Sequence, residues 1–242
     1  MSKCRYDKGM IIGPSLCDFS GRLSLQDALA IFMDIAAEHA DKLGIGLKYL
    51  AKENSFWLTE KTRIHFNRRP FMGEAVEVST WPEQPDGTRC SRDYTITDNG
   101  KVLVEGKTLW AIMDMKAGKL REVKDVYPKD IDILENVVLP EGFTKFDDEN
   151  FGGELLGEYT VNSADIDIGN HMNNAAYGKA LASLFSTEEL KKADFTELEI
   201  HYKGQCHEGE KLTFMKKQED GTLKILAYSA KGKVVCRFIL LH

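Results

Sequence analysis

Several common features are missing from this sequence, and each absence excludes a class of protein. The five cysteines are scattered, odd in number and without a CxxC pair, which argues against a disulfide framework or a structural zinc site. No run approaches the roughly 18 apolar residues that cross a bilayer, and the first residues lack the apolar core of a signal peptide. A net charge of −6 argues against nonspecific nucleic-acid binding. We therefore expect a cytoplasmic protein with no membrane span and no nucleic-acid partner.

The remaining composition is that of a globular protein. The 242 residues are 43% hydrophobic and 29% charged, so the chain can bury a sizeable core. A chain of this length forms one large domain or two of ordinary size.

Comparing the chain with itself reveals an internal repeat. Residues 64–66 and 73–76 match residues 200–202 and 209–212 in type, at a constant offset of 136 positions. Later matches occur at offsets of 134 and 132, as loop trimming between equivalent strands would produce. The sequence therefore predicts a duplicated unit.

The repeat predicts the domain boundaries. We expect a first domain over residues 1–126 and a second over residues 154–242. Residues 127–153 between them are rich in Asp, Glu, Pro and Gly, which is typical of a linker lying on the surface.

Each unit has the pattern of one helix followed by several strands. Ser24 precedes apolar residues at helical spacing, and Gly44 and Gly46 end that stretch. In the second unit a helical stripe runs from Tyr177 to Phe185. Strands are expected over residues 56–66, 75–81, 90–97, 102–114, 197–203, 211–217, 223–230 and 234–241. The pattern favours an α+β fold in which an antiparallel sheet wraps around a helix.

One short segment has the residue types for catalysis. Asp167 precedes His171 by four positions at the start of a predicted helix, where backbone N–H groups are free and an imidazole titrates near neutral pH. The alternative is that these residues only form a turn and a helix cap. The first unit has Asp18 and Ser24 at the equivalent positions but Arg22 in place of the histidine. One active site per chain is therefore expected.

The chain resembles bacterial acyl-acyl-carrier-protein thioesterases, a family of double hot-dog proteins. The residues that carry the resemblance are Phe56-Trp57, 63–70, 73–81, 92–94 and 110–114 in the first half, and 165–167, 171–174 and Tyr177 in the second.

The resemblance implies two hot-dog folds in tandem, an acyl carrier protein as partner, no cofactor, and hydrolysis of fatty acyl thioesters on that carrier. Its catalytic loop has the form Asp-x-Asn-x-His. Asp167 and His171 match this form, whereas Gly169 occupies the asparagine position and the amide follows at Asn170. The family's acidic residue and following cysteine fall on Gln205 and Cys206.

These assignments predict a mechanism. His171 is the expected general base, and Asp167 either orients the imidazole or attacks the carbonyl directly. Backbone N–H groups near Asn173 and Asn174 would polarise the thioester carbonyl. Asn170 and Gln205 can position water but cannot act as bases. An acyl-CoA thioesterase and a noncatalytic acyl-binding protein are the alternatives.

Other candidates have competing interpretations. Trp57 and Trp110 either line the acyl tunnel or belong to the core, and Cys206 is either a nucleophile or a small core residue. A metal site using Cys206, His201 and His207 is not expected. The basic residues of the first unit either dock the acidic carrier protein or form a solvated strand face; they are Lys61, Arg63, Arg68 and Arg69. The duplicated chain is expected to be a pseudo-dimer, with a homodimer of pseudo-dimers as a further expectation.

Overall fold

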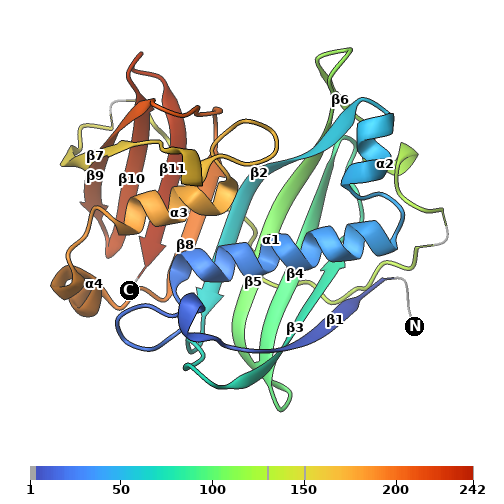
Figure 1. The fold of residues 1–242 in the computed structure, drawn as a ribbon, viewed down its shortest axis with the longest axis horizontal. Coiled ribbons are helices and arrows are strands. Elements are labelled where there is room, and N and C mark those ends of the chain that lie inside the picture. Colours follow the sequence, from blue (N-terminus) through green and yellow to red (C-terminus); the bar gives the residue numbers. More distant parts are fainter. Residues whose placement is uncertain (1–3, 130, 150, 242) are drawn as a thin grey trace.

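A computed structural model describes residues 4–129, 131–149 and 151–241, which form one continuous antiparallel sheet flanked by helices (Figure 1). The first half of the sheet contains, in spatial order, β1 (Tyr6–Ile11), β3 (Ala75–Pro82), β4 (Arg89–Asp98), β5 (Lys101–Asp114) and β2 (Ser55–Phe66). The second half continues with β8 (Glu197–Tyr202), β11 (Val234–Leu241), β10 (Thr222–Ser229), β9 (Lys211–Glu219) and β7 (Glu154–Thr160). The short β6 (Lys119–Arg121) pairs with β5.

The junction between the two halves has the symmetry that the repeat predicts. Strand β2 pairs with β8 so that Lys61 lies opposite His201 and His65 lies opposite Glu197. The offset of 136 makes Lys61 equivalent to Glu197 and His65 equivalent to His201, so exchanging the two units converts one pair into the other. Arg63 faces its own equivalent, Glu199. The predicted tandem double hot-dog of the α+β class is therefore confirmed, with a pseudo-twofold axis at the β2–β8 junction.

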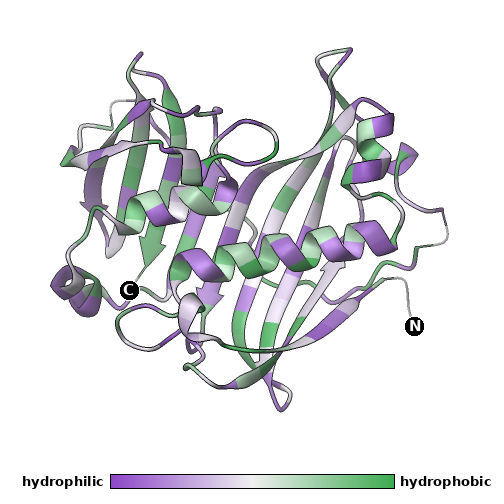
Figure 2. Cartoon of the chain, in the orientation of Figure 1, coloured by the Kyte–Doolittle hydropathy of each residue, from purple (hydrophilic) through white to green (hydrophobic). Residues whose placement is uncertain are grey.

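Helix α1 (Leu25–Lys42) begins where the sequence predicts. The side chain of Ser24 accepts a hydrogen bond from the N–H of Asp27, which satisfies one of the free donors at the helix start. Its apolar residues face the sheet, and the ring of Phe32 stacks on Tyr94 at a centroid distance of 4.6 Å. Hydrophobic and hydrophilic positions alternate along the helix in Figure 2, as expected for a helix with one buried face.

The helix of the second unit is shorter than the predicted stripe. Helix α3 (Asn174–Ala182) ends before Leu184 and Phe185, which lie in a turn. Ser186 then caps α4 (Thr187–Ala193) in a capping box with Glu189. Thus only α1, and not α3, is the long helix that we expected in each unit. The elements that the sequence patterns did not reveal are α2 (Leu47–Lys52), α4, β1, β6 and β7.

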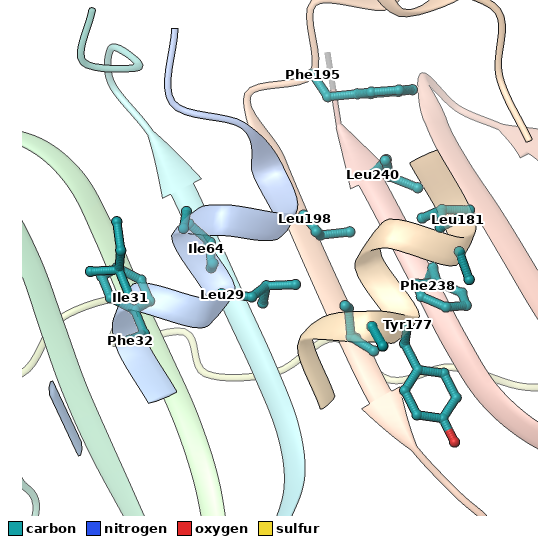
Figure 3. Packing of buried hydrophobic residues seen from close by; sticks show 14 of the residues in the cluster. Leu29, Ile31, Phe32, Ile64, Tyr177, Leu181, Phe195, Leu198, Phe238 and Leu240 are labelled. Atoms are coloured by element: carbon teal, nitrogen blue, oxygen red, sulfur yellow. The ribbon is translucent and has the colours of Figure 1, made fainter. Parts of the chain in front are cut away.

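The two units share one hydrophobic core. Helices α1 and α3 run side by side in opposite directions across the sheet (Figure 1). A Cβ on Gly178 of α3 would stand 2.7 Å from Cδ1 of Leu29 of α1, so a larger residue there would displace the Leu29 side chain between the two helices. Figure 3 shows Leu29 between Ile64 of β2 and Leu198 of β8. Burial of this shared surface holds the units together.

The segment between the units crosses the sheet face that points away from α1. Its described residues, 127–129, 131–149 and 151–153, contain no helix or strand. Buried and half-buried side chains of the sheet hydrogen-bond to it at several points. Trp81 donates to the carbonyl of Asn136, Arg63 to the carbonyl of Gly142 and Arg237 to Asp148, whereas Asp93 accepts from the N–H of Val138 and Glu199 accepts from Thr144. The linker is therefore part of the folded structure.

Membrane-spanning helices are not found within the described residues, because none of their helices is both long and apolar enough to cross a bilayer.

Candidate active site

The loop that carries Asp167 and His171 is a closed five-residue turn immediately before α3. The N–H of Asp167 donates to the carbonyl of His171 at 2.9 Å, and the N–H of Asn170 donates to the carbonyl of Asp167 at 3.0 Å. The Oδ1 atom of Asp167 accepts a hydrogen bond from the N–H of Gly169 at 2.7 Å. We call residues 167–171 the second-unit loop.

A second segment, between β8 and β9, lies against this loop. The N–H of Met172 donates to the carbonyl of Cys206 at 2.8 Å, which places Gln205 and His207 beside the loop. The Nδ1 atom of His207 lies 3.1 Å from the carbonyl oxygen of Asn170, and the rings of His207 and His171 are 5.4 Å apart. In the sequence, His207 is a candidate only as a metal ligand. Its proximity to His171 could not be read from the chain.

Gly169 separates the side chains of the proposed catalytic pair. A Cβ at this position would stand 3.0 Å from Oδ1 of Asp167 and 3.1 Å from Nδ1 of His171. The carboxylate and the imidazole therefore flank the same small space. Asp167 is exposed and His171 is half-buried, so both are accessible from solvent.

The first unit contains the same backbone loop, formed by residues 18–22. The N–H of Asp18 donates to the carbonyl of Arg22 at 2.9 Å, and the N–H of Gly21 donates to the carbonyl of Asp18 at 3.0 Å. The N–H of Ser20 donates to Oδ1 of Asp18 at 2.8 Å. These three hydrogen bonds are those of the second-unit loop, so the two units can be compared residue by residue.

The side chains around the two loops differ. In the first unit the guanidinium of Arg69 pairs with Asp18. Burial would raise the pKa of Asp18, but hydrogen bonds from Ser20 and Arg69 hold it below its ordinary value. The offset of 136 places Gln205 where the first unit has Arg69. No ion pair engages Asp167 among the described residues, and this carboxylate is therefore available for other contacts.

The backbone explains Asn170 without a catalytic role. Asn170 has a φ of 62°, and Gly21 at the equivalent position has a φ of 73°. Asparagine is among the few residues other than glycine that adopt this left-handed conformation readily. The turn therefore accounts for the asparagine at this position, and the expected catalytic amide is not needed to explain it.

The predicted oxyanion donors reduce to one. The side chain of Asn173 caps α3 by accepting from the N–H of Ala175, and its own N–H donates to the carbonyl of Asp165 at 2.8 Å. The N–H of Asn174 has no acceptor among the described residues. The N–H of Asn173 is therefore already engaged, and the N–H of Asn174 is the free candidate donor at the start of α3.

Cys206 has the surroundings of a core residue. It is fully buried, and the hydroxyl of Tyr177 donates to its Sγ at 3.2 Å. Burial raises the pKa of the Cys206 thiol. Because the thiolate is the reactive form, this environment opposes a role as nucleophile.

The two predicted tryptophans lie together in the first unit. The ring of Trp57 meets Trp110 edge-on at a centroid distance of 6.3 Å, and Nε1 of Trp57 donates to the carbonyl of Ile45 at 3.0 Å. Both side chains pack against buried clusters of apolar residues. These contacts are compatible with either interpretation, a core position or a tunnel wall.

The basic residues of the first unit do not form one free surface. Arg63 is 9% exposed; its Nε and Nη2 atoms donate to Glu197, and its Nη1 atom donates to the carbonyl of Gly142. These contacts oppose the predicted role of Arg63 in carrier docking. Lys61 lies over the ring of Phe143, and burial lowers its pKa.

The remaining two arginines each form an ion pair within the first unit. Arg68 pairs with Glu74, and Arg69 pairs with Asp18. These ion pairs and a docking role are equally good explanations for the two arginines.

No group of three or more His, Cys, Asp or Glu side chains able to hold a metal ion occurs among the residues that the structure describes. His201, which the sequence left as a candidate ligand, is buried and bonds to Glu199 under the linker.

The fold and the loop together define a hot-dog pseudo-dimer with one Asp–His pair, and comparisons with known proteins identify its family. Residues 3–131 match the model of the acyl-ACP thioesterase N-terminal domain, and residues 151–239 match that of the C-terminal domain. The chain belongs to the acyl-ACP thioesterase family.

Two solved structures share the fold over nearly the whole chain. An acyl-ACP thioesterase from Bacteroides thetaiotaomicron has a TM-score of 0.83 and 21% identity, over 100% of this chain and 99% of that one. The 12:0-ACP thioesterase from Umbellularia californica has a TM-score of 0.76 and 18% identity, over 98% and 96% of the two chains.

Curated relatives are longer proteins. A chloroplastic acyl-[acyl-carrier-protein] hydrolase, FATB3 of Cuphea viscosissima, is 25% identical over 82% of this chain and 52% of its own length. Oleoyl-acyl carrier protein thioesterase 2 of Arabidopsis thaliana is 22% identical over 74% and 54%. The chain thus spans about half the length of these relatives.

Proposed function

We propose that this protein hydrolyses fatty acyl-acyl-carrier-protein thioesters to free fatty acid and carrier protein. The observation that carries the proposal is the contrast between the two loops. Their backbones form the same hydrogen bonds, but only the second has a histidine and a carboxylate free of an arginine. A loop with a purely structural role would not need this difference. The family and the names of the relatives agree with the proposed substrate.

The geometry supports the following mechanism. His171 takes a proton from a water molecule, which attacks the thioester carbonyl, and Asp167 supports the imidazole from the opposite side of Gly169. The N–H of Asn174 stabilises the developing oxyanion. The proton then passes from His171 to the leaving sulfur. Gln205 can orient the water through a hydrogen bond but cannot accept its proton.

The test compares His171 with its counterpart in the first unit. Replacing an effective general base lowers turnover by about 10²- to 10⁴-fold, so His171→Ala should reduce kcat for acyl-carrier-protein by that amount. Arg22→Ala, at the equivalent position, is the matched control and should keep kcat close to that of the wild type. Equal turnover in the wild type and in His171→Ala would refute the assignment.

The same assay separates the alternatives. A matched acyl-CoA is offered beside the acyl-carrier-protein, with a binding measurement on both. Preference for the CoA ester would identify an acyl-CoA thioesterase, and binding without turnover would identify a noncatalytic acyl-binding protein. Repeating the assay across chain lengths defines the acyl group, for which Trp57 and Trp110 remain proposed tunnel residues.

Docking of the acidic carrier stays a proposal for Lys61, Arg68 and Arg69. Arg68 has the most exposed side chain among the salt-bridged arginines of this group, at 36%. Arg68→Gln should raise KM for the carrier-linked substrate without changing KM for the CoA ester.

A cytoplasmic location and a homodimer of pseudo-dimers also remain predictions. Light scattering of the purified protein tests the oligomeric state.

A further inference from the structure

The two loops are closed in different ways. In the first unit the N–H of Met72 donates to the carbonyl of Gly21 at 2.9 Å, and Arg22 forms an isolated β-bridge with Phe71. Asn170 is the counterpart of Gly21. Among the described residues no backbone N–H donates to the carbonyl of Asn170. Instead, Nδ1 of His207 lies within hydrogen-bond distance of this carbonyl oxygen, at 3.1 Å.

We propose that His207 is a positioning residue for the thioesterase reaction. Its Nδ1–H donates to the carbonyl of Asn170 and so holds the loop that presents Asp167 and His171. The inference rests on the proposed function of that loop. His207 is exposed and makes its contact through a side chain, so the loop keeps its shape without the backbone bridge that closes the first unit.

The residue of the first unit that is equivalent to His207 is Phe71, which has an aromatic ring but no hydrogen-bond donor. Phe71 packs against Gly21, and its ring lies 2.9 Å from the point where a Cβ on that glycine would stand. Phenylalanine fills the space but has no donor, and the first unit uses the N–H of Met72 for the carbonyl instead. Histidine at this position supplies both the ring and the donor. The difference between the two residues is therefore the hydrogen bond.

Three substitutions at His207 separate the donor from the ring. His207→Phe keeps the ring and removes the donor. His207→Asn keeps a donor at the position of Nδ1, because the amide nitrogen of Asn and Nδ1 of His lie at the same distance along the side chain. His207→Gln moves the donor outward, toward the position of Nε2. Phe71→Ala is the matched control in the first unit.

The kinetic readout is the division of the effect between kcat and KM. Misplacement of a catalytic group by about 1 Å costs about 10²-fold, so His207→Phe and His207→Gln should lower kcat by about 10- to 100-fold with KM unchanged. His207→Asn should recover most of the activity, and Phe71→Ala should not differ from the wild type. An unchanged kcat in His207→Phe, or equal losses in all three variants, would overturn the proposal.

A second readout is independent of catalysis. The N–H groups of Asp167 and Asn170 bond inside the loop, and their exchange with solvent can be followed by NMR. Both should exchange faster in His207→Phe and His207→Gln than in the wild type and His207→Asn. This pattern in a protein without thioesterase activity would refute the proposed function and leave the positioning role intact. Identical exchange in all variants would refute the positioning role even if the enzyme is active.

Discussion

Gln205→Arg should inactivate the second-unit loop by copying the first. Gln205 is the counterpart of Arg69, whose guanidinium pairs with Asp18 in the first unit. Since the two loops share their backbone hydrogen bonds, an arginine at position 205 has the same reach toward Asp167. The carboxylate would then bind the guanidinium in place of supporting His171.

The expected changes in kcat and in the free energy of unfolding differ enough to distinguish an effect on the site from an effect on the fold. Asp167 and Gln205 are both exposed, and an ion pair in solvent changes the free energy of unfolding by about 0–1 kcal/mol. The catalytic effect should be far larger, because losing general-base catalysis costs about 10²- to 10⁴-fold. A fall of at least about 10²-fold in kcat, at nearly constant unfolding free energy, is therefore expected.

The assay measures free thiol released from acyl-carrier-protein, together with urea unfolding of the same preparations. Gln205→Met is the control for loss of the amide without gain of charge. Arg69→Gln tests the first unit: kcat should not change, and only KM for the carrier-linked substrate should respond if Arg69 contributes to docking. High salt should partly restore Gln205→Arg, because screening weakens an exposed ion pair. Wild-type kcat in Gln205→Arg would show that Asp167 does not need to be free, which refutes the reasoning.

Three further predictions concern other expected site residues. Asn170→Gly should keep kcat within a few fold in the thiol-release assay, whereas Asn170→Val should lose activity and stability because a β-branched residue opposes a φ of 62°. Cys206→Ala should retain turnover, and Cys206 in the folded protein should resist iodoacetamide because burial raises its thiol pKa. Arg63→Met should lower the unfolding free energy by about 3–5 kcal/mol in urea, because it removes the guanidinium that donates two hydrogen bonds to the buried Glu197. Adding Glu197→Leu to that variant should recover much of the loss, and a failure to do so would contradict this account of the pair.

Local patterns predicted the parts of the fold that depend on short stretches of chain. The cap at Ser24 and the eight expected strands follow from residue types at short spacing, and the offset of 136 follows from short motifs that recur; the structure agrees with all three. The stripe from Tyr177 to Phe185 failed at its end. Apolar residues continue past Ala182, but the strong cap at Ser186 starts a new helix and the chain turns between them. Hydrophobic periodicity alone does not predict that a new helix begins within an apolar stretch.

The candidate site was predictable only where its residues lie close together in the chain. Asp167 and His171 belong to one turn, and their residue types mark the chemistry. The surroundings come from segments 30 or more positions away, and they change the interpretation of several residues. Arg63 looks like part of an exposed basic cluster in the sequence, but the linker covers it and Glu197 pairs with it.

The sequence by itself determined that the chain is a duplication and that only the second copy has a histidine in its loop, because both facts are matters of residue identity at fixed spacing. Only the tertiary structure decided which carboxylate is free. Asp18 and Asp167 accept and donate the same backbone hydrogen bonds within their loops, and the difference in ion pairing arises from residues 69 and 205, which the fold places against the two loops. Charge pairing depends on distance in space, and the sequence does not contain that distance.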